Sequence, residues 1–109
     1  MLAEIRRPTI LKNAAFIKLS KGKVAIVDET DCVWLSQFRW YAKKSSTRYY
    51  AVRKVYTKNK VVLERMHRLI AGTPSYFVCH HKNSNPLDNR RENLENMRRG
   101  DHDIIHFKT

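Results

Sequence analysis

Turn-forming residues interrupt this chain at short intervals, which leaves room only for short helices and strands. The segments 20–23, 44–47 and 57–60 and the longer segment 82–92 are rich in residues that favour turns, and Gly72 ends another apolar run. The runs between them are rich in β-branched and aromatic residues, which favour strands. We therefore expect an α+β fold built from short antiparallel strands and a few short helices.

The apolar patterns predict where these elements lie. Residues 15–19 and 24–27 flank a turn that contains a glycine, which predicts a hairpin. Asp31 suits the N-cap of a short helix, and Gly72 suits the end of another. The predicted strands are 15–19, 24–27, 40–43, 48–56, 61–65, 76–81 and 93–97, and the predicted helices are 31–38, 66–71 and one that opens at Gly100-Asp101.

At 109 residues and 12.9 kDa, the chain has the length of one small domain. We expect this domain, 1–109, to have two parts. The first, 1–75, is predicted to be a small antiparallel β-sheet module with short helices, and the second, 76–109, to be a compact strand-strand-helix unit.

The charge of the chain predicts a polyanionic partner. Lys and Arg number 22 against 10 acidic residues, which gives a net charge of +12. In the first part, four basic residues lie among aromatic residues on predicted strands, and we expect them to contact DNA: Arg39, Arg48, Arg53 and Lys54. Trp34 and Trp40 are expected to belong to the core.

Other features of the composition indicate a reduced, intracellular setting. Two cysteines are too few for a disulfide framework or for a four-cysteine zinc site. No signal peptide and no apolar run of membrane-spanning length is recognisable. We expect a cytoplasmic protein without a membrane partner.

Four histidines and an asparagine near the C-terminal end have a spacing that suits chemistry. His80 and His81 are adjacent, Asn93 follows, and His102 and His106 come one helical turn apart. Strand alternation would send His80 and His81 to opposite faces. His80, His102 and His106 could then bind one divalent cation, while His81 acts as a base and Asn93 orients the His81 ring.

Residues Val78 to Leu94, with the sequence VCHHKNSNPLDNRRENL, resemble the HNH endonuclease motif. They are most similar to the small phage and intron-encoded branch of that superfamily, as are Met66–Ile70 and the pattern from Leu35 to Tyr50. The resemblance spans about residues 15–106. It implies a ββα-metal fold in 76–109, a metal ligand at positions 80 and 102, and a base at 81.

The chain departs from that branch at two of these positions. Many relatives have Asp where this chain has His80 and Asn where it has His102. Three imidazoles form a borderline site that should bind Zn²⁺ or Ni²⁺ tightly, whereas Mg²⁺ or Mn²⁺ is expected to support activity.

The function expected from these features is metal-dependent hydrolysis of DNA phosphodiester bonds by a phage or prophage protein in a bacterial cell. Arg90 and Arg91 are expected to hold a phosphate oxygen. Two alternatives remain: an inactive nucleic-acid-binding module with the same fold, and a zinc-stabilised structural protein, which the low cysteine count disfavours. We expect His67 to be a packed structural residue, and Asp88 and Asn89 to hydrogen-bond the loop backbone. The sequence leaves the target site, the cleavage pattern and the oligomeric state open.

Overall fold

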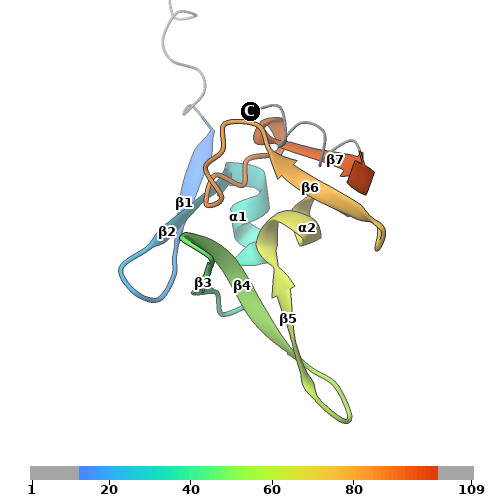
Figure 1. Cartoon of the computed structure of the whole chain (residues 1–109). Coiled ribbons are helices and arrows are strands. Elements are labelled where there is room, and N and C mark those ends of the chain that lie inside the picture. The colour runs from blue at the N-terminus through green and yellow to red at the C-terminus, as the bar shows by residue number, and fades with distance from the viewer. Residues whose placement is uncertain (1–12, 101–109) are drawn as a thin grey trace, which may run out of the picture.

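The computed structural model describes residues 13–100, and within them the chain has the predicted α+β class. Its short antiparallel strands form three small sheets, β1–β2, β3–β4–β5 and β6–β7, with two α-helices and a 3₁₀ turn between them (Figure 1). The elements in chain order are β1 (Ala14–Lys18), β2 (Val24–Asp28), α1 (Glu29–Leu35), β3 (Tyr41–Ser45), β4 (Arg48–Tyr56), β5 (Val61–Arg65), α2 (Met66–Ala71), β6 (Phe77–His81), η3 (Arg91–Asn93) and β7 (Leu94–Arg98).

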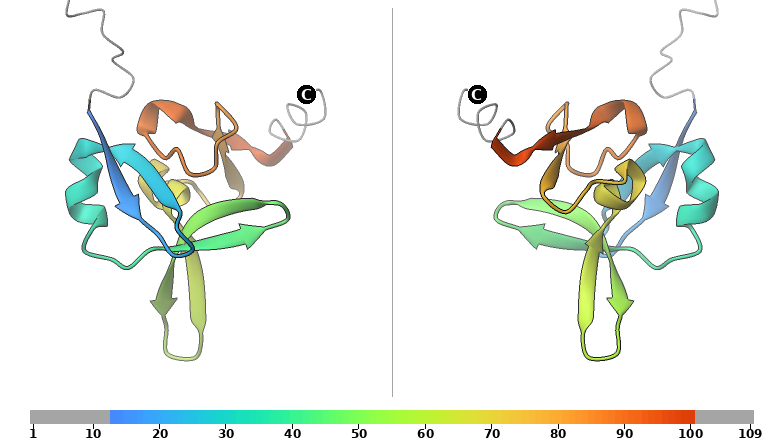
Figure 2. Two further views of the ribbon diagram at one scale, coloured as in Figure 1. Left: turned by 90° about the vertical axis from the view of Figure 1, so that its left-hand side faces the viewer. Right: turned by 90° about the vertical axis from the view of Figure 1, so that its right-hand side faces the viewer.

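The strands of the first part agree closely with the sequence prediction. β1 and β2 form the expected hairpin, whose turn places Lys21 and Gly22 at positive φ. β4 and β5 have the predicted bounds, and the outer end of this hairpin projects from the rest of the molecule (Figures 1 and 2). Because β4 is nine residues long, its first half pairs with β3 and its second half with β5, and Ala51 and Val52 near its middle are buried.

Helix α1 differs from the prediction. It begins at Glu29, and Asp28 occupies the N-cap position without a side-chain cap hydrogen bond. Asp31, the predicted cap, lies inside the helix and is buried, while the side chain of Val33 is 81% exposed. The prediction was wrong because Asp31 has partners elsewhere in the fold that a local pattern does not reveal.

Helix α2 has the predicted bounds and the predicted end. Gly72 adopts the left-handed conformation with φ of 59° at its C-terminal cap, where a side chain would be strained. The helix buries Met66, His67 and Ile70. Its first turn therefore brings a histidine into the interior of the molecule.

The hydrophobic core lies between the sheets and the two helices. Val27, Leu35 and Met66 are fully buried, and Trp40 donates its indole N–H to the Leu35 carbonyl at 2.8 Å. Leu94 of β7 belongs to the same cluster, so both predicted parts of the chain contribute to it. Within residues 13–100, no helix has the length and apolar character needed to cross a membrane.

The second part contains the two predicted strands and the long loop between them. β6 pairs with β7 so that His80 is opposite Glu95 and His81 is opposite Leu94. β7 begins at Leu94 instead of Asn93, because Asn93 closes the η3 turn. Arg99 and Gly100 are helical. The rest of the predicted helix, with His102 and His106, lies outside the described residues.

Candidate functional site

Strand β2 holds the loop between β6 and β7 in place. The Ile26 amide donates to the Leu87 carbonyl at 2.8 Å, and the Asn89 amide donates to the Ile26 carbonyl at 2.7 Å. Ile26 and Asp88 form a parallel bridge at the same point. The backbone around Asn89 is therefore fixed by a strand more than 60 residues earlier in the chain.

This attachment places Asn89 beside the predicted base. The Nε2 atom of His81 lies 2.8 Å from Oδ1 of Asn89, and both side chains are buried. An amide oxygen only accepts hydrogen bonds, so Nε2 carries the proton and Nδ1 retains its lone pair. Asn89 thus sets the tautomer that a base requires. We had expected Asn89 to bond to the loop backbone, and its side chain binds the His81 ring instead.

Asn93 has a different role from the predicted one. Its Nδ2 donates to Asn83 Oδ1 at 2.9 Å and to the Asp88 carbonyl at 2.8 Å, and its Oδ1 accepts from the Asn83 amide at 3.0 Å. The predicted contact between Asn93 and the His81 ring is not formed. Asn93 instead joins the end of the loop to Asn83 at its start and to Asp88 within it.

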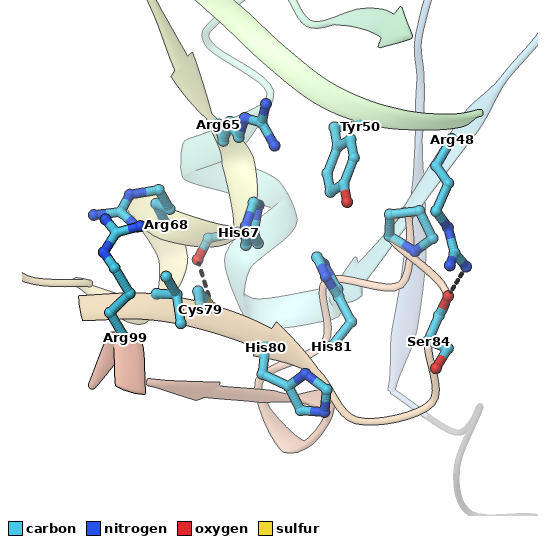
Figure 3. A pocket seen from close by; sticks show the side chains of 12 residues that line it. Arg48, Tyr50, Arg65, His67, Arg68, Cys79, His80, His81, Ser84 and Arg99 are labelled. Carbon is cyan, nitrogen blue, oxygen red and sulfur yellow. Dashed lines mark hydrogen bonds between the residues drawn. The ribbon is translucent and has the colours of Figure 1, made fainter. Parts of the chain in front are cut away.

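His81 belongs to a cluster of rings from three elements. The His67 ring of α2 lies 4.6 Å from the His81 ring, centroid to centroid, and Tyr50 of β4 lies 5.9 Å from His67 and 6.3 Å from His81. Figure 3 shows the two imidazoles and the phenol converging, with His80 directed away from them. His80 is only half-buried, as expected from strand alternation.

Both imidazoles of this cluster are held in the neutral form. Burial lowers the pKa of His81, an effect that the hydrogen bond to Asn89 partly opposes. Burial, together with the nearby His81, Arg65 and Arg68, lowers the pKa of His67 to about 3. A neutral His81 is the form that accepts a proton near pH 7. The prediction that His67 is packed inside the fold is confirmed.

An open cavity of about 560 Å³ lies against this cluster, and its lining is rich in cations (Figure 3). Four arginines from different parts of the chain line it, and none of its described lining residues is acidic. The lining residues are Arg48, Tyr50, Arg65, His67, Arg68, Val78, Cys79, His80, His81, Ser84, Pro86 and Arg99. Arg48 donates to the Ser84 carbonyl, and Arg68 donates to the Phe77 and Pro74 carbonyls. These bonds orient the guanidinium groups without neutralising them, so the cavity favours an anion.

Of these four arginines, only Arg48 was among the basic residues expected to contact DNA, and Arg65, Arg68 and Arg99 were not. Arg65 and Arg68 flank His67 in the sequence, but Arg48 and Arg99 are distant from it. The hairpin register of β4 and the end of β7 bring the four together. No local pattern in the sequence contains that information.

Arg90 and Arg91, the predicted phosphate ligands, are bound to carboxylates. Arg90 forms a two-point contact with Asp88 at 2.8 and 2.6 Å, and Arg91 forms one with Asp31 at 2.8 and 2.9 Å. Asp88 was expected to bond to the loop backbone, and it bonds mainly to the Arg90 and Asn83 side chains. The geometry that suits a guanidinium to phosphate also suits it to carboxylate. Arg90 therefore holds the loop together, and Arg91 joins it to α1.

The other predicted DNA ligands gather in a separate hollow. Arg39, Arg53 and Lys54 lie there with Phe38, Tyr41 and Tyr56. Arg53 is stacked on the Phe38 ring at 4.0 Å and bonded to Glu64 at 2.8 Å. Arg39 and Lys54 are exposed, so they remain accessible to a polyanion.

Of the three predicted metal ligands, the described chain contains only His80. Residues 13–100 contain no group of three His, Cys, Asp or Glu side chains with metal-binding geometry. His81, the neighbouring imidazole, is bonded to Asn89. A metal site of the predicted composition therefore requires ligands beyond residue 100, where His102 and His106 lie in the sequence.

Comparisons with protein-family models, with curated proteins and with solved structures found no match to this chain.

Proposed function

We propose that this protein is a divalent-metal-dependent HNH endonuclease that hydrolyses phosphodiester bonds in DNA. One observation carries the proposal: His81, a buried imidazole with its tautomer set by Asn89, lies in a cavity that four arginines and no described acidic residue line. Either feature alone, a base without an anion site or an anion site without a base, would have a simpler explanation than catalysis. Their combination suits the hydrolysis of an anionic substrate.

In this proposal, the arginines bind the phosphate groups and the imidazole moves the proton. Guanidinium groups of Arg48, Arg65 and Arg99 would contact the DNA backbone around the scissile phosphate. Nδ1 of His81 would take a proton from the attacking water, and the Nε2–H bond to Asn89 would stabilise the imidazolium that results. The proposed metal, held by His80 with His102 and His106, would stabilise negative charge on the phosphate and the leaving oxygen.

Plasmid cleavage tests the proposal directly. The pure protein with Mg²⁺ or Mn²⁺ should convert supercoiled plasmid to nicked or linear form, and chelator should prevent this. The His81→Ala variant, purified identically, should lower the rate by at least about 100-fold, the usual contribution of a general base, and it excludes a contaminating nuclease. DNA binding without cleavage by the wild type would instead identify the inactive binding module, and His81→Ala at the wild-type rate would refute the base.

Metal binding tests the ligand set separately. We expect calorimetric titration to show tighter binding of Zn²⁺ or Ni²⁺ than of Mg²⁺, as three imidazoles favour borderline metals. His80→Ala and His102→Ala should weaken affinity strongly, His106→Ala less, and His81→Ala only slightly. Equal and negligible losses in the first three variants would exclude this metal site.

A further inference from the structure

His67 is a buried imidazole next to the proposed base, and the proposed reaction leaves it without a role. Its side chain is in the cavity lining, and the described residues give its ring no hydrogen bond. Its contact with the His81 ring, at 4.6 Å between centroids, is its closest aromatic contact.

The position of His67 is fixed by the way in which α2 docks on β6 and β7. Thr73, just beyond α2, donates to Asn96 Oδ1 at 2.6 Å, and Asn96 Nδ2 donates to the Ala71 carbonyl at 2.9 Å. At the other end of the helix, the Cys79 thiol lies 3.8 Å from the His67 carbonyl. Arg68 also joins α2 to the start of β6. The helix is therefore held against β7 near its C-terminal end and against β6, the strand that carries His81, through His67 and Arg68.

Strand β4 confines the two imidazoles from another direction. Tyr50 contacts both rings, and the Arg65 guanidinium lies 4.5 Å above the Tyr50 ring. The His67 and Tyr50 rings are tilted to the His81 ring by 42° and 55°, whereas Asn89 binds His81 at Nε2. One hydrogen bond at an edge leaves an imidazole free to rotate about the axis of that bond. The His67 ring, 4.6 Å away between centroids, restricts this rotation by contact.

We propose that His67 is a positioning residue, whose ring packs against His81 and fixes the direction in which Nδ1 of His81 points. The inference rests on the proposed function, because it concerns the base of that reaction. It assigns His67 a packing role, not proton transfer or substrate binding. Proton abstraction depends steeply on geometry, and a displacement of about 1 Å can cost about 100-fold in rate.

Two substitutions separate packing from hydrogen bonding. His67→Phe keeps an aromatic ring of similar size but removes both ring nitrogens, and His67→Ala removes the ring. We expect kcat of His67→Ala to fall about 10- to 100-fold, with KM within about twofold, because orientation is lost and binding is retained. His67→Phe should restore kcat to within a few-fold of wild type.

Ile70→Ala is a matched control for loss of stability. Ile70 is buried in the same helix but does not line the cavity. The Ile70→Ala substitution should destabilise the fold at least as much as His67→Ala while leaving kcat of the folded protein near wild type. A His67→Phe variant as slow as His67→Ala would overturn the proposal, because the nitrogens would then be needed, and so would a His67→Ala variant at the wild-type rate.

Imidazole NMR tests the packing without any cleavage assay. In the wild type, the His81 ring protons should show one sharp set of resonances and cross-relaxation with the His67 ring. In His67→Ala the His81 resonances should broaden or divide, and in His67→Phe they should stay sharp. Failure of the wild type to cleave DNA would refute the proposed function, whereas a sharp His81 signal in His67→Ala would refute the positioning role alone.

Discussion

Asn89 contacts the His81 ring and Asn93 bonds within the loop, whereas from the sequence we expected Asn93 to orient that ring. Asn93 connects Asn83 to the Asp88 carbonyl instead. Both asparagines are almost fully buried, which fits residues with fixed hydrogen-bonding roles. The Nδ2 atom of Asn89 is the exception, since it is buried without a partner among the described residues. Asn89 therefore contributes less to stability than its burial would suggest.

These two roles predict that Asn93→Ala mainly lowers stability, whereas Asn89→Ala mainly lowers activity. Asn93→Ala removes three side-chain hydrogen bonds of the loop, so we expect a loss of about 2 to 4 kcal/mol in the free energy of unfolding. Asn89→Ala should cost less stability but lower kcat about 10- to 100-fold, because the tautomer and orientation of His81 are no longer set. Urea denaturation and single-turnover cleavage measure the two quantities. A stable Asn93→Ala variant without activity would restore the original assignment.

His67 also predicts how stability depends on pH. Its pKa of about 3 in the folded state is well below the ordinary value of 6.5, so the unfolded chain binds a proton over a range in which the folded protein does not. The contribution of neutral His67 to the free energy of unfolding is complete above pH 6.5 and decreases as the pH falls below that value. At pH 5 the loss attributable to His67 is about 2 kcal/mol relative to pH above 6.5.

Comparison with His67→Phe isolates this effect. Between pH 7 and pH 5 the wild type should lose about 2 kcal/mol more stability than the variant, measured by urea denaturation at each pH. Asp31 and Asp88 also have lowered pKa values, the first through its hydrogen bond with Arg91 and the second through Arg90 and Asn83 against the effect of burial. Their contribution is lost only below the ordinary aspartate range near pH 4, so it does not affect this window. Parallel curves for the two proteins would contradict the neutral, buried state of His67.

At the scale of elements, an ion pair joins α1 to the loop that carries the site. Arg91 of η3 binds the buried Asp31 carboxylate, to which Trp34 also donates at 2.9 Å, and the Arg91 amide donates to Asp28 at 3.0 Å. The Arg91 side chain is 57% exposed, so water screens its charge. The two partners differ in exposure, so removing Arg91 leaves a buried carboxylate, whereas removing Asp31 leaves an exposed cation.

We therefore expect Arg91→Ala to destabilise the fold by about 1 to 3 kcal/mol, the cost of leaving a buried charged acceptor partly unsatisfied. Arg91→Lys should recover only part of the loss, because an ammonium cannot form the two parallel bonds. Thermal or urea denaturation of Arg91→Ala, Asp31→Asn and the double variant gives the coupling energy. Additive effects would mean that the pair does not hold α1 to the loop.

The elements that the sequence predicts well are those whose pattern is local. β4, β5 and α2 have the predicted bounds, because Gly72 and the turn at 57–60 mark their ends. α1 was misplaced because Asp31 looks like a cap in isolation, and its true partner is 60 residues away. Arg65, Arg68, Arg99 and the Asn89 contact were missed for the same reason: their positions depend on β2 holding the loop and on the strand registers.

At the scale of the whole molecule, the distribution of carboxylates divides the arginines into two groups. Arg53, Arg90 and Arg91 are paired with Glu64, Asp88 and Asp31. The four arginines of the cavity have no carboxylate partner among residues 13–100. With a net charge of +12, the chain has enough cations to attract DNA over much of its surface. The cavity gathers four such arginines around His81, so we expect the strongest phosphate contacts there.

The salt dependence of DNA binding tests this distribution. Binding should be measured in the His81→Ala background with chelator, from about 50 to 300 mM salt, where each phosphate contact contributes about 0.9 to the slope of log K against log salt. Replacing Arg65 and Arg99 together by Gln should lower that slope by about 2 and weaken binding to all sequences alike. Both arginines line the cavity, and neither makes one of the backbone hydrogen bonds that orient Arg48 and Arg68.

The matched control replaces Arg53 and Lys54, also two cations, by Gln. Because Arg53 is bonded to Glu64 and Lys54 lies over the Tyr41 ring, at 2.8 and 5.2 Å respectively, we expect a change in slope of about 1 or less. The sequence assigned DNA contact to this second pair, so the experiment compares the two assignments directly. A larger change for Arg53 and Lys54 than for Arg65 and Arg99 would place the main DNA contact on the β3–β4 hollow, away from His81. The cavity would then need another anionic ligand to account for its uncompensated charge.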